Sequence, residues 1–270
     1  MDAQVLDEGK RLRVATTNVA AFDVDLTTCP LANSESYQIR TNDNDLTLPA
    51  TDDASLAVQA SRSPAAQGGW PPAKRKGLCG PAEDVLNTAF LVVQGTAGTE
   101  QQNAELARQV GAWAEEWDDF GDGPPRVCTD RELAEEDIGR FNLVLFGTPQ
   151  TNAAVGRIAD KLPITIGEHS YTLAGKTYQG AELGLVLCYP NPIAPDRYVL
   201  IYAGKLYGRK CSSNHKHDML PDFLIFDSTK FTTGDTESNV CGGWFDVDWL
   251  PRPELTWEGD EEPMPAAIQW

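Results

Sequence analysis

The sequence predicts an α/β protein with a Rossmann-like or flavodoxin-like, mostly parallel sheet, preceded by a small β-rich segment. Three observations predict this fold class. Beyond residue 76, apolar runs typical of buried strands alternate with helical patterns, as in a parallel sheet covered by helices on both faces. Two of these runs end in turns rich in glycine and threonine that lead into helices. Over residues 14–70, short alternating runs separated by Asn, Asp, Thr and Pro are typical of strands and turns.

The join between the two parts is expected at residues 68–77, which combine glycine, proline and basic residues. Domain boundaries commonly fall in segments of this composition. We therefore expect a β-rich N-terminal segment over residues 1–75, an α/β domain over residues 76–250 and an irregular acidic tail over residues 251–270.

The elements of the second part are predicted from hydrophobic periodicity. An amphipathic helix is expected over residues 100–118, where Leu106 and Trp113 share one apolar stripe. Residues 164–180 contain two turns and are expected to form a β-hairpin or meander. The predicted strands are residues 89–93, 126–128, 141–146, 184–189, 198–202 and 223–226, and shorter helical pieces are expected at 133–138 and 155–159.

The charge balance excludes one class of partner. The chain carries 22 Lys and Arg residues against 40 Asp and Glu residues, which gives a formal net charge of -18. This charge opposes binding to nucleic acid or to an anionic membrane unless basic residues are concentrated in a patch. The two basic clusters, residues 74–76 and 209–210, are too short to supply one, so we expect no nucleic-acid partner.

No membrane insertion is expected either. No run of about 18 apolar residues occurs, so the sequence predicts no transmembrane helix. The N-terminal segment carries Asp2, Asp7 and Glu8 and lacks the apolar core of a signal peptide.

The six cysteines are scattered along the chain without a CxxC pair, a pattern that indicates neither a zinc ribbon nor a dithiol redox motif. Cys128 and Cys188 lie in or beside predicted strands and are expected to be core thiols. Cys211 and Cys241 are the candidate disulfide pair.

Two strand-to-helix turns form the main candidate site. They are residues 95–99 (Gly-Thr-Ala-Gly-Thr) and residues 147–152 (Gly-Thr-Pro-Gln-Thr-Asn). Both are expected at the carboxyl ends of parallel strands, where open α/β folds bind ligands and helix N-termini offer N–H groups to an anion. The alternative is purely structural, because glycine suits a tight turn and Thr or Asn caps a helix. The predicted ligand-binding residues are Thr96, Thr99, Thr148, Thr151 and Asn152.

A second candidate site is the polar segment 211–218, Cys-Ser-Ser-Asn-His-Lys-His-Asp. His215 and His217 can ligate zinc or copper together if both rings point the same way, as alternate residues of a strand do. A Ser or Cys nucleophile beside a histidine is also conceivable. The competing interpretation is a solvated loop, because the segment has no strand or helix pattern of its own.

The familiar enzyme motifs do not occur in the sequence. Residues 174–177 (Ala-Gly-Lys-Thr) resemble the end of a phosphate-binding loop, but Ser170 stands where that motif needs a glycine. Neither a G-x-S-x-G nucleophile elbow nor a G-x-G-x-x-G dinucleotide motif is found. We therefore expect no cofactor, and whether the chain is an enzyme stays open.

A series of segments in the second part of the chain forms a recognisable order of motifs. They are residues 76–85 (Lys-Gly-Leu-Cys-Gly-Pro-Ala-Glu-Asp-Val), 90–93, 136–138, 142–147, 189–192 (Tyr-Pro-Asn-Pro), 195–199 and 221–227. This order of motifs resembles a domain of large exported bacterial hydrolases. In planctomycete esterase or prolyl-oligopeptidase-like proteins, a region with this order of motifs lies C-terminal to the catalytic α/β-hydrolase domain. The resemblance covers residues 76–228, with a looser likeness over residues 16–70, and it carries no catalytic residue over to this chain.

The resemblance implies an accessory role outside the cytoplasm. No hydrolase domain precedes the region in this sequence, which implies an isolated accessory module, a piece of a longer chain or a standalone relative. The leading hypothesis is a non-catalytic binding or assembly module, secreted or periplasmic, whose partner is a hydrolase domain or copies of itself. Two alternatives stay open: a hydrolase of the esterase or peptidase type, with its site at the carboxyl ends of the parallel strands, and a self-assembling structural protein.

Overall fold

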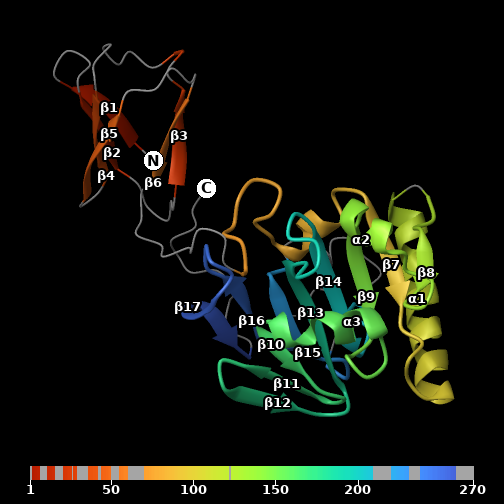
Figure 1. The fold of residues 1–270 in the computed structure, drawn as a ribbon. Coiled ribbons are helices and arrows are strands. Elements are labelled where there is room, and N and C mark those ends of the chain that lie inside the picture. Colours follow the sequence, from red (N-terminus) through yellow and green to blue (C-terminus); the bar gives the residue numbers. More distant parts are fainter. Residues whose placement is uncertain are drawn as a thin grey trace. The chain divides into compact units, whose positions relative to one another are not determined.

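In the computed structural model the chain divides into two compact units, residues 1–64 and 65–270, each with its own buried apolar core (Figure 1). The residues that the structure describes are 2–6, 11–15, 21–25, 27–28, 36–41, 44–49, 55–59, 70–121, 123–208, 220–230 and 238–259.

The described part of the first unit consists of short strands in two sheets. The four-stranded sheet has the order β1 (Asp2–Leu6), β2 (Arg11–Ala15), β4 (Ser36–Thr41) and β5 (Asn44–Pro49), and β2 and β4 run parallel. The second sheet pairs β3 (Ala21–Asp25) with β6 (Ser55–Gln59). Side chains alternate between the two faces of a strand, and those that point inward form the core: Leu12, Val14, Val24, Ile39 and Val58.

The second unit is organised around an eight-stranded mixed sheet with the order β17-β16-β15-β13-β14-β9-β7-β8. Neighbours are parallel in one half, which contains β8 (Val127–Thr129), β7 (Phe90–Gln94), β9 (Asn142–Phe146) and β14 (Tyr198–Gly204). They are antiparallel in the other half, which contains β13 (Leu183–Pro190), β15 (Phe223–Asp227), β16 (Asn239–Phe245) and β17 (Pro251–Glu258). The direction changes at β14, which is parallel to β9 and antiparallel to β13.

The α-helices of the described residues belong to the parallel half. They are α1 (Glu100–Gly121), α2 (Glu135–Arg140) and α3 (Ala153–Ile158), which follow β7, β8 and β9 in the chain. Figure 1 shows them grouped around these strands, because a parallel neighbour can be reached only by a crossover connection. Single 3-10 turns occur at η2 (Ala82–Val85) and η3 (Ala159–Lys161). No helix in the described part of the chain is long and apolar enough to cross a membrane.

A separate three-stranded antiparallel meander confirms the prediction for residues 164–180. It consists of β10 (Ile164–Ile166), β11 (Ser170–Leu173) and β12 (Lys176–Gln179). Ala174 and Gly175 both have positive φ, 48° and 85°, as a two-residue hairpin turn requires. The buried hydroxyl of Tyr171 donates to the carbonyl of Ala203 at 2.9 Å, so the meander is attached to β14.

The predicted fold class is wrong. The protein is mostly β, with a mixed eight-stranded sheet and a separate meander, and it is not a Rossmann-like or flavodoxin-like α/β protein. The prediction failed because β13 and β15 are continuous apolar runs, the pattern of a parallel strand covered on both faces. Both are buried along nearly their whole length in the structure, but their neighbours within this half of the sheet run antiparallel.

The first residues of the expected irregular tail form a strand instead. Residues 251–258 form β17, the edge strand of the eight-stranded sheet. Its two prolines, Pro251 and Pro253, are the reason that the sequence did not predict this strand. Proline has no N–H to donate, so within a sheet it occurs mainly on edge strands, at the first residue of a strand or at bulges.

Candidate functional site

The structure brings the two predicted glycine–threonine turns, residues 95–99 and 147–152, into contact. These strand-end turns follow β7 and β9, and their backbones are joined by hydrogen bonds from Gly95 N to Phe146 O (3.1 Å) and from Ala97 N to Thr151 O (3.0 Å). A Cβ on Gly95 would lie 2.4 Å from Thr151 O. Glycine is therefore needed here because the two backbones approach too closely for a side chain.

Asn152 joins the strand-end turns to the sheet. Its buried side chain caps α3, with Oδ1 accepting from the backbone N–H groups of Ala154 (2.9 Å) and Val155 (3.3 Å). Its Nδ2 donates to Val93 O at 3.2 Å and to Phe146 O at 3.0 Å. Because an amide has two N–H donors and two acceptor lone pairs, this side chain has no capacity left for a ligand.

The threonines of the turns also bond within the protein. Thr148 and Thr151 are buried, and the backbone N–H of Thr148 donates to Thr151 Oγ1 at 2.9 Å. Thr99 directly precedes α1 and caps its N-terminus. Gln102 N donates to Thr99 Oγ1 at 3.3 Å, and in return Thr99 N donates to Gln102 Oε1 at 2.9 Å. This arrangement is a capping box.

Asp130, which the sequence interpretation did not select, completes this region. Its Oδ1 accepts from Thr96 N (3.1 Å) and Thr96 Oγ1 (2.5 Å), and its Oδ2 accepts from Ala153 N in the first turn of α3 (2.7 Å). A negative charge is favourable at a helix N-terminus. The protein's own carboxylate therefore stands where an anionic ligand was expected. The available signal was the position of this Asp, directly after a predicted parallel strand.

All five predicted ligand-binding residues are thus near the ends of β7 and β9, but the contacts they make are those of a structural joint. The ligand-binding role stays a prediction. The other candidates, His215 and His217, lie outside the described residues, as does Cys211. Cys241 is a buried free thiol. Over the ranges that the structure describes, no group of three or more His, Cys, Asp or Glu side chains is placed to hold a metal ion.

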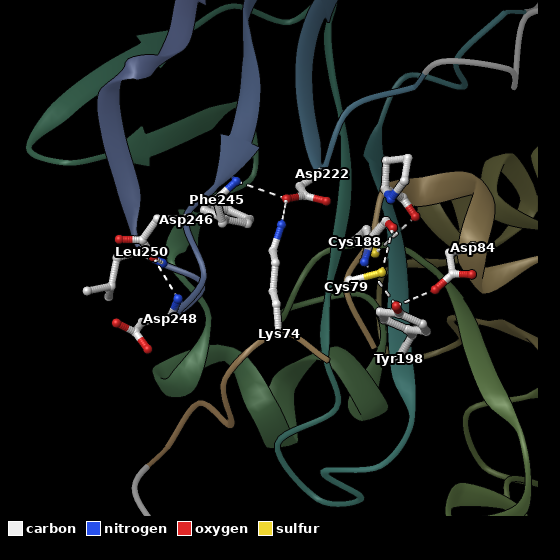
Figure 2. Close-up of polar contacts among 12 residues, drawn as sticks. Lys74, Cys79, Asp84, Cys188, Tyr198, Asp222, Phe245, Asp246, Asp248 and Leu250 are labelled. Atoms are coloured by element: carbon white, nitrogen blue, oxygen red, sulfur yellow. Dashed lines mark hydrogen bonds and ion pairs between the residues drawn. The ribbon is translucent and has the colours of Figure 1, made fainter. Parts of the chain in front are cut away.

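A second polar cluster, not selected from the sequence, lies at the antiparallel half of the sheet (Figure 2). We call it the Lys74 cluster; it consists of Lys74, Cys79, Asp84, Cys188, Tyr198 and Asp222. Lys74 Nζ donates to Asp222 Oδ2 at 2.6 Å and lies 4.5 Å from the centre of the Trp249 ring. Phe245 N donates to the same carboxylate oxygen at 2.9 Å. An ion pair and a cation–π contact therefore hold the segment around Lys74 to the start of β15 and to the connection between β16 and β17.

Asp222 is fully buried, and burial raises the pKa of its carboxyl, against the opposing effect of Lys74. Its second oxygen, Oδ1, is buried without a hydrogen-bond partner. This oxygen faces Gly80, where a Cβ would lie only 2.0 Å away. The loop can thus close over the carboxylate only because residue 80 is glycine.

Tyr198 connects the same loop to β14. Its hydroxyl donates to Asp84 Oδ2 at 2.5 Å and accepts from Gly80 N at 3.0 Å. Burial, and next the hydrogen bond to Asp84, raise the pKa of Tyr198. The phenol therefore stays protonated at neutral pH and acts as a hydrogen-bonding link between η2 and the sheet.

The cluster contains two free thiols, Cys79 on the exposed loop and Cys188 inside β13. The burial of Cys188 confirms that it is a core thiol. Burial raises the pKa of both, and the carboxylates of Asp84 and Asp222 act in the same direction. Lys74 only partly opposes this rise. Because the thiolate is the nucleophile, neither sulfur is activated for attack at neutral pH.

A small apolar pocket lies between the sheet and the helices α2 and α3. Leu133, Ile138, Leu143 and Ile158 are among its lining residues, and its polar lining comes from Arg157 and Asn191. The buried Nδ2 of Asn191 has no hydrogen-bond partner. The guanidinium of Arg157 already pairs with Glu135, which leaves the amide of Asn191. A substrate site needs several polar groups that converge on the ligand, and this pocket does not provide them.

Comparison with known protein families, with curated proteins and with solved structures finds no match for this chain.

Proposed function

We propose that this chain is a non-catalytic binding or assembly module that acts outside the cytoplasm, with the second unit as its rigid scaffold. One observation carries the proposal. At the carboxyl ends of β7 and β9, the side chains of Asn152, Asp130 and Thr96 bond to the protein itself, which is how a structural joint uses its polar groups.

The Lys74 cluster supports the same conclusion. Its charged groups, Lys74 and Asp222, neutralise each other at 2.6 Å in a buried position. The thiols of Cys79 and Cys188 have raised pKa values. Catalytic groups are usually tuned the other way, with a lowered thiol pKa or a base within reach of a nucleophile. The cluster therefore serves to attach residues 74–84 to the sheet.

The partner we propose is a hydrolase domain or a second copy of the chain. The basis is the resemblance of residues 76–228 to regions C-terminal to catalytic domains in exported bacterial hydrolases. Strands β7 to β15, which form the centre of the second unit, all lie in that range.

A hydrolysis assay tests the non-catalytic part of the proposal. The purified chain is offered chromogenic esters and fluorogenic peptides, beside a Thr148→Val variant and a Thr99→Ala control at the exposed helix cap. We expect all three proteins to give the rate of buffer alone. Turnover by the unaltered chain that Thr148→Val abolishes, with circular dichroism showing that the variant is folded, would contradict the proposal.

A mass measurement tests the binding part. Sedimentation velocity is run on the chain alone over a wide concentration range, and then on an equimolar mixture with the catalytic domain of an exported α/β-hydrolase. We expect a species heavier than the monomer in one of these experiments. A monomer at every concentration, with no complex in the mixture, would count against a binding or assembly role.

A further inference from the structure

The two sulfurs of the Lys74 cluster lie at the same loop. Cys79 Sγ lies 3.5 Å from Gly80 O, and Cys188 Sγ lies 3.8 Å from Pro81 O, the next carbonyl along the chain. Figure 2 shows the sulfur of Cys79 turned toward that of Cys188. The two thiols also interact electrostatically. The sulfur of Cys79 on the 78–81 loop and the sulfur of Cys188 on β13 therefore lie against consecutive carbonyl groups of the same loop.

The backbone on both sides is held in place. Gly80 N is bonded to the hydroxyl of Tyr198, and the side chain of Leu78 is fully buried. Cys188 lies within β13, between β14 and β15, and its N–H donates to Asp222 O at 2.7 Å. A disulfide forms only where two backbones are already close, and here the backbones of the loop and of β13 are both fixed by hydrogen bonds beside the same carbonyls.

We propose that Cys79 and Cys188 form a disulfide in an oxidising environment and so bind the 78–81 loop covalently to β13. This inference is independent of the proposed function, since it rests on the positions of the two sulfurs alone.

The difference in exposure sets the order of the reaction. Cys79 is exposed and Cys188 is fully buried, so an external disulfide such as oxidised glutathione reaches Cys79 first. Because the pKa of Cys79 is raised, the attack is slow and proceeds through the small fraction of thiolate, which attacks one sulfur of that disulfide, breaks its S–S bond and releases one thiol. Cys188 then loses its proton and attacks the Cys79 sulfur, which forms the internal bond and releases the second thiol. Two cysteine thiols are oxidised and one external disulfide is reduced.

The bond would close a long loop in the unfolded chain and so disfavour unfolding. It would also hold in place the segment that brings Lys74 to Asp222. We therefore expect oxidation to raise the midpoint temperature of unfolding of the full chain, and reduction to lower it again.

Peptide mapping of the full chain tests the proposal. The protein is reduced, equilibrated with oxidised glutathione, unfolded in urea that contains N-ethylmaleimide so that buried thiols are also blocked, digested and analysed by mass spectrometry without reduction. We expect a cross-linked peptide that contains Cys79 and Cys188, and no maleimide on either residue. Cys79→Ser should abolish this peptide and the rise in unfolding temperature, whereas Cys128→Ser, at the half-buried thiol of β8, should leave both unchanged.

Cys79→Ser changes an exposed residue, so loss of the fold does not obscure the result, and circular dichroism checks it. Two results would overturn the proposal. One is maleimide on Cys188 after oxidation; the other is Cys79 carrying glutathione as a stable mixed disulfide while Cys188 stays reduced.

Discussion

The parallel and antiparallel halves of the eight-stranded sheet are made from similar sequences but are held by different contacts. β9 and β15 are both short, buried apolar strands. The ends of β7 and β9 are joined by a neutral amide, Asn152, which bonds only to backbone groups, and the Asp130 carboxylate beside it accepts hydrogen bonds without a cationic partner in those contacts. In the antiparallel half, the buried ion pair of Lys74 and Asp222 connects the segment before β7 to the start of β15. The comparison shows that an apolar run indicates only that a strand is buried. The polar residues next to the run determine which contacts connect the strand to the rest of its half of the sheet.

The largest effect is expected from Asp222→Ala in the antiparallel half. The change leaves the Lys74 ammonium without its partner in a site where its side chain is only 15% exposed. Breaking a buried pair from one side costs about 3–5 kcal/mol of unfolding free energy. Urea unfolding followed by tryptophan fluorescence measures the loss.

A double variant is the control for this prediction. In Lys74→Met with Asp222→Leu both charges are absent, so we expect much of the lost stability to return. If Asp222→Ala costs less than about 1 kcal/mol, the ion pair does not distinguish the two halves.

Asn152→Ala probes the parallel half and is expected to cost about 2–3 kcal/mol, because it removes a helix cap and the side-chain N–H donors to Val93 O and Phe146 O, of which Phe146 O keeps only its bond from Gly95 N. Thr99→Ala is the matched control, since it removes an exposed cap and should cost about 0.5–1 kcal/mol. The measurement is again urea unfolding. Equal losses in the two variants would mean that the amide does not join β7 to β9 in the manner described.

A smaller effect is expected at β14, where the two halves meet. Tyr198→Phe removes the hydroxyl that bonds to Asp84 and Gly80, and should cost about 1–2 kcal/mol. Tyr171→Phe, which removes one good hydrogen bond to Ala203, should cost less, and urea unfolding of both variants measures the difference. The reverse order would show that the loop is not held through Tyr198.

The smallest effect concerns pH and the edge strand β17. Glu258 pairs with Lys176 and accepts a hydrogen bond from Tyr178 at 2.7 Å. Both partners lower the pKa of Glu258 below its ordinary value of 4.5. A lowered pKa contributes stability above the unfolded value, and this stability is lost as the pH falls through the folded value.

The variant that tests this is Glu258→Gln. Because the side chain is 47% exposed, the difference from the unaltered chain should stay below about 1 kcal/mol at neutral pH. Urea unfolding at a series of pH values should show the difference shrinking as the pH falls below 4.5. A difference that is the same at all pH values would contradict an electrostatic origin.

The candidate sites differ in how far the sequence could predict them. The turns after β7 and β9 were found because glycine and a capping residue after an apolar run form a local pattern. Lys74 and Asp222 were missed because they stand 148 positions apart and neither has a pattern around it. A charged residue beside the buried run 223–226 was the available signal, but its partner could not be named.

Two strands of the second unit, β16 and β17, were missed for a related reason. β16 contains Gly242 and Gly243, residues that weaken a strand pattern. A Cβ on Gly243 would lie 2.4 Å from Leu255 O, so this glycine is required by the close approach of β17. That requirement exists only once the two strands are side by side, and the sequence alone does not contain it.

The sequence by itself determined most of the buried strands of the second unit, where α1 begins, and that residues 164–180 form a meander, because burial and turns depend on neighbouring residues. Only the tertiary structure decided the direction of β13 and β15 and the pairing of Lys74 with Asp222. Strand direction depends on hydrogen bonds between distant segments, and a run such as β15 fits either kind of neighbour. A buried charge needs a partner from elsewhere in the chain, and the fold determines which residue that is.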